Sequence, residues 1–177
     1  MTQKAKIKES SKVVCVCLSR DEKYIISGCA NYIIKLWCIE RKSPVAKLIG
    51  HDSIIWSLSV SIDGRFLVSG SHDCTVRVWD LNYKLEDAIL VGHKRPVMSV
   101  CMDRDMKFIV SSSIDNTVRV WSMDTKHQIS ALNCHSDIVK AVCVSNNRKF
   151  IISGSMDRPI NVWITQKDTN TIKVKSL

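Results

Sequence analysis

The chain has 177 residues, of which 45% are hydrophobic and 24% are charged, and its formal net charge is +9. This length suits one domain with a proper core or a short repeat array. No apolar run approaches the roughly 18 residues of a membrane-spanning helix, and the basic N-terminus lacks the apolar stretch of a secretory signal. The sequence therefore indicates a globular protein of the cytoplasm or the nucleus, rather than a membrane-spanning one.

The positive charge is concentrated in the two flanks. Residues 1–12 carry four lysines against Glu9, and residues 165–177 carry three against Asp168, so the flanks contain +5 of the +9. A nucleic-acid-binding surface typically has a Lys/Arg stripe on one face, with aromatic residues for stacking. We interpret the flanks as solvated tails. Binding of nucleic acid or ribosomes through these lysines is the alternative.

Five residue types recur at intervals of 42 along the chain. One series is tryptophan, one is Tyr or Phe, one is serine, one is Asn or Asp, and one is histidine. The series are Trp37, Trp79, Trp121 and Trp163; Tyr24, Phe66, Phe108 and Phe150; Ser27, Ser69, Ser111 and Ser153; Asn31, Asp73, Asp115 and Asp157; and His51, His93 and His135. An interval kept over four copies means equal loop lengths, as expected when each copy is one unit stacked on the next. We place the four repeats at about residues 9–50, 51–92, 93–134 and 135–177.

The second copy shows the strand pattern of one repeat. Residues 55–60 and 65–70 are β-rich runs, and the Asp63-Gly64 pair between them is a strong hairpin-turn signal. A short turn leads into residues 75–79, where Val76 and Val78 alternate with Arg77 and Trp79, and a longer loop precedes a fourth run at 88–91. Because no helical period occurs, each copy is predicted to form a small twisted sheet of four antiparallel strands.

The two ends of the chain carry further strand candidates. Residues 1–8 are a basic N-terminal segment, and KAKIK at 4–8 fits an outer strand of a neighbouring sheet. At the other end, TIKVK at 171–175 aligns with the fourth strand of a repeat, so the last sheet is expected to be complete.

The eight cysteines follow the repeat and do not form pairs by spacing. Cys17, Cys101 and Cys143 occupy one repeat position, where the second repeat has Ser59. The position therefore requires a small side chain, and we interpret these cysteines as small buried residues rather than disulfides or metal ligands. No Cys/His group has zinc-finger spacing, and we expect neither a metal nor a cofactor.

With these recurring residues the chain resembles the WD-repeat family, whose unit has a Gly-His near its start and a Trp-Asp near its end. The second repeat has both, as Gly50-His51 and Trp79-Asp80. The third repeat has Gly92-His93 but ends in Trp121-Ser122, and the fourth has Cys134-His135 and Trp163-Ile164. The first repeat departs furthest, with Glu9 at the His position, Asn31 at the Asp position and Trp37-Cys38 at its end. The resemblance covers residues 9–177 and implies an all-β fold of four-stranded β-propeller blades.

Three repeats contain a Ser, a His and an Asp, which invites comparison with a hydrolase triad. The set occurs three times at one spacing, whereas a chain needs one active site, and no Gly-x-Ser-x-Gly elbow surrounds these serines. The resemblance implies a buried structural network instead, and we expect no enzyme activity. The expected network residues are His51, Ser69, Asp73 and Trp79; His93, Ser111, Asp115 and Trp121; and His135, Ser153, Asp157 and Trp163.

If the recurring residues form the framework, the binding surface must come from positions that vary between copies. Trp56 stands where the other copies have Val14, Met98 and Lys140, and in similar propellers this position faces the top of the central channel. An exposed cluster of Trp, Met and Ile is typical of an interaction surface, although packing between blades is the alternative for these residues. The expected partner-binding residues are Ile54, Trp56, His72, Pro96, Met98, Ile114, Ile138, Lys140 and Met156.

Four blades are fewer than a WD-type ring usually contains, so we expect an open half-ring or part of a larger propeller. The chain could be a piece of a longer propeller, two copies could close an eight-bladed ring as a homodimer, or a partner could supply blades. The sequence predicts a protein-interaction scaffold that binds other proteins in a multiprotein assembly through the top face of a propeller. It does not identify the partner, because propellers serve many unrelated assemblies.

Overall fold

The computed structural model describes the backbone of residues 6–133, 135–168 and 171–176, with side chains up to residue 165. Within these ranges the chain contains sixteen strands in four sheets and no helix, and hence no helix long and apolar enough to cross a membrane. In every sheet the strands are neighbours in chain order and pair antiparallel. The predicted all-β fold of four four-stranded blades is confirmed.

Each sheet is one blade, running from an inner to an outer strand. Blade 1 contains β1 (Val13–Leu18), β2 (Tyr24–Cys29), β3 (Ile34–Cys38) and β4 (Ser43–Leu48). Blade 2 contains β5 (Ile55–Val60), β6 (Phe66–Ser71), β7 (Thr75–Asp80) and β8 (Leu85–Val91). Blade 3 contains β9 (Val97–Met102), β10 (Phe108–Ser113), β11 (Val118–Ser122) and β12 (Gln128–Leu132). Blade 4 contains β13 (Val139–Val144), β14 (Phe150–Ser155), β15 (Ile160–Asp168) and β16 (Thr171–Ser176).

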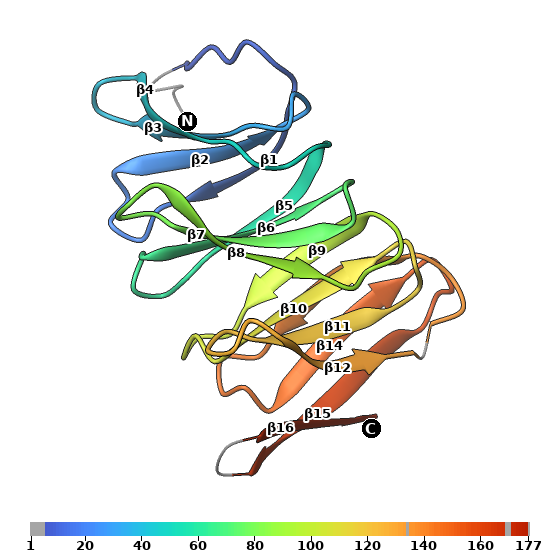
Figure 1. Ribbon diagram of the computed structural model, residues 1–177. Helices are drawn as coiled ribbons and strands as arrows, with labels where there is room; N and C mark the ends of the chain where they lie inside the picture. The colour runs from blue at the N-terminus through green and yellow to red at the C-terminus, as the bar shows by residue number, and fades with distance from the viewer. Residues whose placement is uncertain (1–5, 134, 169–170, 177) are drawn as a thin grey trace, which may run out of the picture.

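The blades follow one another in chain order, with the first and the last at opposite ends of the array (Figure 1). Neighbouring blades meet mainly through their inner strands: β1 contacts β5, β5 contacts β9, and β9 contacts β13. Each blade therefore rests on its sequence neighbours, as the equal spacing of the repeats predicts.

The strands of blade 2 lie close to their predicted positions, except for the start of the outer strand. Strand β8 begins at Leu85, although the apolar run begins only at Ala88. The first residues of β8 are exposed, and the Glu86 carboxylate pairs with the guanidinium of Arg77 on β7. An outer strand pairs with a neighbour on one side only, so its residues can be polar and exposed to solvent. A pattern of apolar residues therefore does not mark the start of such a strand.

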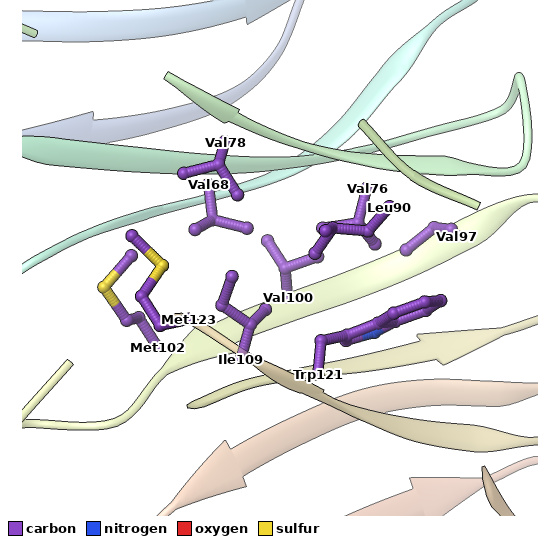
Figure 2. Close-up of a cluster of buried hydrophobic side chains, with 10 residues drawn as sticks. All are labelled: Val68, Val76, Val78, Leu90, Val97, Val100, Met102, Ile109, Trp121 and Met123. Carbon is purple, nitrogen blue, oxygen red and sulfur yellow. The ribbon is translucent and has the colours of Figure 1, made fainter. Parts of the chain in front are cut away.

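The core lies between the blades rather than inside them. Figure 2 shows one cluster, in which side chains from blade 2 pack against side chains from blade 3. Its buried members are Val68, Val76, Val78, Leu90, Val97, Val100, Met102, Ile109, Trp121 and Met123. Similar clusters join blades 1 and 2 and blades 3 and 4. Since burial of apolar area is the main source of stability, most of the folding free energy belongs to these junctions.

The candidate strands at the chain ends differ in outcome. Strand β16 covers the run predicted at residues 171–175, so the fourth blade has its outer strand. In the candidate strand at 4–8, residues 4 and 5 lie outside the described residues, and residues 6–8 are not part of a sheet.

Candidate functional site

The recurring polar residues of blade 2 form one hydrogen-bonded chain. The indole Nε1–H of Trp79 donates to Ser69 Oγ at 2.8 Å, and Ser69 Oγ lies 2.7 Å from His51 Nε2. The other ring nitrogen, His51 Nδ1, lies 2.6 Å from Asp73 Oδ2. The chain thus connects the inner-strand loop at His51, strands β6 and β7, and the turn between those strands.

The chemistry of the end groups sets the direction of this chain. An indole nitrogen can only donate, so Ser69 Oγ accepts from Trp79, and a carboxylate can only accept, so Asp73 accepts from His51 Nδ1. In the tautomer with its proton on Nδ1, His51 Nε2 accepts from the Ser69 hydroxyl. Burial by itself would raise the pKa of Asp73, but the hydrogen bonds from His51 and Thr75 outweigh burial and lower the pKa well below its usual range. Asp73 is therefore held as a carboxylate within the network.

Blades 3 and 4 repeat the network with small differences. In blade 3, His93 lies 2.7 Å from Ser111 and 2.9 Å from Asp115. Burial lowers the pKa of His93 and favours its neutral form. In blade 3, the Trp121 indole N–H donates to Ser111. In blade 4, the corresponding hydrogen bonds link His135, Ser153, Asp157 and Trp163. In blade 4, Pro159 takes the place of Thr75 and so lacks the backbone N–H and hydroxyl that Thr75 donates to its aspartate.

Blade 1 replaces the histidine–aspartate pair with a lysine–glutamate pair. Trp37 Nε1 still donates to Ser27 Oγ at 2.9 Å. Glu9 occupies the histidine position and forms an ion pair with Lys35, and both side chains are more than nine-tenths buried. Blade 1 thus has a buried charged pair in the place of the histidine–aspartate pair, with the acidic group on the N-terminal side.

The serines of these networks cannot act as hydrolase nucleophiles in this fold. Ser69, Ser111 and Ser153 are each fully buried, and each hydroxyl lies between a tryptophan N–H and a histidine nitrogen. A nucleophile must reach the substrate carbon, and no substrate can approach these oxygens while the blade is folded. Their chemistry is that of a satisfied buried network, which fixes the turns of the blade.

Three of the residues predicted to bind partners, Trp56, Met98 and Lys140, lie at a β-bulge that all four inner strands share. In each inner strand the pairing with the next strand skips one residue near the strand's start. The skipped residues are Val14, Trp56, Met98 and Lys140. A bulge kinks the strand and redirects the extra side chain, and bulges are common next to functional sites.

Two further sets of predicted residues are joined by a recurring backbone hydrogen bond. The N–H of His72 donates to the carbonyl of Ile54 at 2.8 Å. The same bond links Ile114 to Pro96 at 3.0 Å and Met156 to Ile138 at 3.0 Å. Each bond connects the loop before an inner strand to the turn between the two middle strands. We call this edge of the blades, with the bulge residues, the top face.

The side chains on the top face differ in exposure. His72, Lys140 and Met156 are exposed, and Met156 shows 56% of its surface to solvent. The other six predicted residues, Ile54, Trp56, Pro96, Met98, Ile114 and Ile138, are half-buried. The Trp56 ring lies beside the ring of His72, with 6.5 Å between centroids. Exposed and half-buried apolar groups thus alternate with polar ones on this edge.

The structure adds residues to the top face that the sequence did not indicate. Lys94, Arg95 and Asp137 line an open hollow of about 470 Å³ between blades 3 and 4, together with Ile114 and Ile138. These charged residues sit in the loops before β9 and β13, where the other copies have different residues. The variation of these loop residues between copies could have indicated a binding surface, but it does not show which loops lie side by side in the fold.

Four antiparallel blades stacked through their inner strands define a β-propeller arrangement. The family model described as WD domain, G-beta repeat matches the chain four times, at residues 2–38, 42–80, 86–122 and 126–163. The chain belongs to this family of WD-repeat proteins. No curated protein matches it in sequence.

Solved structures share the fold at low sequence identity. A structure of U3-55K is similar with a TM-score of 0.84 and 21% identity, over 94% of this chain and 52% of that chain. A crystal structure of RRP9 WD40 repeats gives a TM-score of 0.83 and 21% identity, again over 94% of this chain and 52% of the other. The chain spans about half the length of these structures, and at this identity the similarity concerns the fold alone.

Proposed function

We propose that the protein is a non-catalytic scaffold that binds other proteins of a multiprotein assembly through its top face, in the cytoplasm or the nucleus. One observation carries the proposal. All four inner strands have the same bulge, yet the residue at the bulge differs in chemistry each time: aliphatic Val14, aromatic Trp56, thioether Met98 and cationic Lys140. A position with constant backbone and varied side chains suits recognition rather than folding.

The composition of this edge supports a protein partner. Tryptophan, methionine and isoleucine gather there, and aromatic residues and methionine are enriched in protein interfaces. The neighbouring hollow adds Lys94, Arg95 and Asp137, which can form the polar rim that surrounds an apolar interface centre. Both charges are present in this rim, whereas a surface for nucleic acid is expected to carry a continuous basic stripe.

A photo-crosslinking experiment tests the proposal. Trp56 is replaced by benzoylphenylalanine in the full chain, with the same replacement at Tyr83 as the matched control, because Tyr83 is 73% exposed in the β7–β8 loop at the opposite edge of the same blade. The proposal expects a defined set of proteins crosslinked from position 56 and absent from position 83. Crosslinking to nucleic acid, or equal protein capture at both positions, would contradict it.

A further inference from the structure

A hollow of about 460 Å³ opens between blades 1 and 2, at the edge of the blades opposite to the top face. We call this edge the bottom face, and this hollow the bottom hollow. Its two walls belong to blades that pack against each other within the described residues. The side chains that give it an apolar lining are Tyr24, Ile26, Leu36, Val45 and Leu81. Its volume lies within the range of ligand pockets, roughly 300–1,000 Å³.

One turn residue decides whether a junction has space at the bottom face. Gly64, Met106 and Arg148 occupy the same repeat position, each with a left-handed backbone. Met106 packs against the cluster between blades 2 and 3, and the guanidinium of Arg148 reaches blade 3, where it lies 2.7 Å from the Asp105 carboxylate. A Cβ placed on Gly64 would contact only Arg20 among the described residues outside its own turn. Blade 2 therefore leaves open the space that blades 3 and 4 fill with a side chain.

The junction between blades 1 and 2 also lacks a carboxylate that the next junction has. Between blades 2 and 3, Lys126 Nζ lies 2.7 Å from Asp87 Oδ2. The equivalent residues between blades 1 and 2 are Lys84 and Val45, which both line the bottom hollow. Lys84 is exposed, and no carboxylate in the described part of the chain forms an ion pair with it. The lysine is thus kept while its acidic partner is replaced by an apolar side chain.

The remaining charged groups of the hollow leave its free charge positive. Arg20 and Arg41 line it, and neither forms an ion pair with a carboxylate of the described residues. The two acidic residues of the lining are Asp21 and Asp63. Each of them accepts a serine hydroxyl and a backbone N–H of its own turn, so both carboxylates already have partners. An acidic ligand would therefore find unpaired cations beside an apolar surface.

We propose that the bottom hollow binds a short acidic segment of a partner protein. One side chain of the size of Met or Leu fills the space beside Gly64, and a neighbouring Asp or Glu pairs with Lys84. The next junction has both groups in place within the chain, as Met106 and Asp87, so it shows what the hollow lacks. This site lies at the opposite edge from the top face and is a second binding surface, beyond the scaffold function proposed for that face.

Peptide selection on the full chain tests the proposal. A phage-displayed library of random ten-residue peptides is selected on the unchanged chain and, in parallel, on Gly64→Met, in which methionine fills the hollow as Met106 fills the next junction. We expect peptides that only the unchanged chain retains, and these should combine a Met or Leu with a nearby Asp or Glu. No difference between the two selections, or retained peptides without acidic residues, would overturn the proposal.

Fluorescence anisotropy of the most enriched peptide, labelled with fluorescein, then tests the role of charge. Lys84→Glu should weaken binding about tenfold or more, because like charges then face each other. Lys149→Glu is the matched control, since Lys149 is exposed in the β13–β14 turn of the same face but does not line the hollow, and it should change binding by less than about twofold.

A charge exchange separates recognition from a structural role of the lysine. A peptide in which the acidic residues are replaced by lysine should bind Lys84→Glu more tightly than it binds the unchanged chain. Equal effects of Lys84→Glu and Lys149→Glu on the acidic peptide, or no recovery by the exchange, would overturn the proposal.

A second variant fills the need of the hollow without altering the turn. Val45→Asp offers Lys84 a carboxylate from blade 1, as Asp87 does for its lysine in the next junction, and should also abolish peptide binding. Thermal unfolding followed by circular dichroism confirms that this variant and Gly64→Met are folded, which is expected because Met106 has the same left-handed backbone. Peptide binding that persists in folded Val45→Asp would contradict the proposed pairing.

A variant of the top face distinguishes this proposal from the scaffold function. Trp56→Ala should leave binding of the selected peptide within about twofold, because the two faces lie at opposite edges of the blades. If Trp56→Ala abolished binding, the peptide would occupy the top face. That result would overturn the bottom site and leave the scaffold function standing.

Discussion

Ser69 Oγ lies 2.8 Å from the indole nitrogen of Trp79 and 2.7 Å from His51 Nε2, so one fully buried hydroxyl accepts one hydrogen bond and donates another. Both partners depend on this oxygen for a hydrogen bond in the interior of blade 2. The relationship recurs at Ser111 and Ser153 and fixes the direction of the whole network.

Ser69→Ala should destabilise the protein by about 1–3 kcal/mol, because it leaves the Trp79 N–H and His51 Nε2 buried without partners. Urea unfolding followed by tryptophan fluorescence measures the effect. Ser136→Ala is the matched control, since Ser136 is exposed in the loop before β13, and this change should stay within about 0.5 kcal/mol. Equal effects of the two substitutions would show that the network does not stabilise the blade.

Stability should fall as the pH decreases below about 6.5. Burial lowers the pKa of His93 from its ordinary value of 6.5, so the unfolded chain takes up a proton first and is favoured as the pH falls through this value. Asp73, Asp115 and Asp157 have pKa values below the ordinary 3.8, because hydrogen bonds outweigh burial, and their stabilisation is lost on further acidification. Asp103 acts in the opposite direction, since burial raises its pKa.

Urea midpoints measured at a series of pH values check this dependence. Replacing His93 with Gln should flatten the slope just below pH 6.5, because the titrating group is gone, whatever the substitution does to the overall stability. An unchanged slope in His93→Gln would mean that this histidine does not titrate differently in the folded and unfolded states.

The turn between the first two strands of each blade requires a left-handed backbone, and only blade 2 provides a glycine for it. Gly64 has φ of 73°, and the equivalent Glu22, Met106 and Arg148 have φ of 57°, 55° and 59°. Glu22→Gly should therefore stabilise the protein by up to about 1 kcal/mol, and Gly64→Ala should destabilise it by a similar amount. Thermal unfolding of the two single variants decides the point. A loss of stability in Glu22→Gly would show that backbone strain does not dominate there.

Much of this fold could be predicted from the sequence, because the 42-residue period reports structural equivalence directly. The period identifies His51, Ser69, Asp73 and Trp79 as recurring residues, the family resemblance implies that they form one network, and the structure places them in hydrogen-bonding contact. The start of β8 was wrong by three residues, because backbone pairing of an outer strand continues through polar residues that no apolar pattern marks.

The top face was harder to predict. Divergence between copies pointed to Trp56, Met98 and Lys140, but it could not show that these residues occupy a bulge, because a bulge is a property of pairing between strands. The exposure of Val16 and Ile160 in the described residues was also not visible in the pattern, because these residues have the same chemistry as their buried equivalents and differ only in what packs against them.

The most direct test of the scaffold account is a paired measurement on Trp56→Ala, namely its free energy of unfolding and its affinity for a partner recovered by crosslinking at position 56. The account predicts that the variant unfolds cooperatively with a modest loss of stability, while partner binding weakens by about 2 kcal/mol or more, or roughly thirtyfold. Unchanged affinity in a folded variant would contradict the account. So would global unfolding, which would show that Trp56 is a core residue and that the top face needs another anchor.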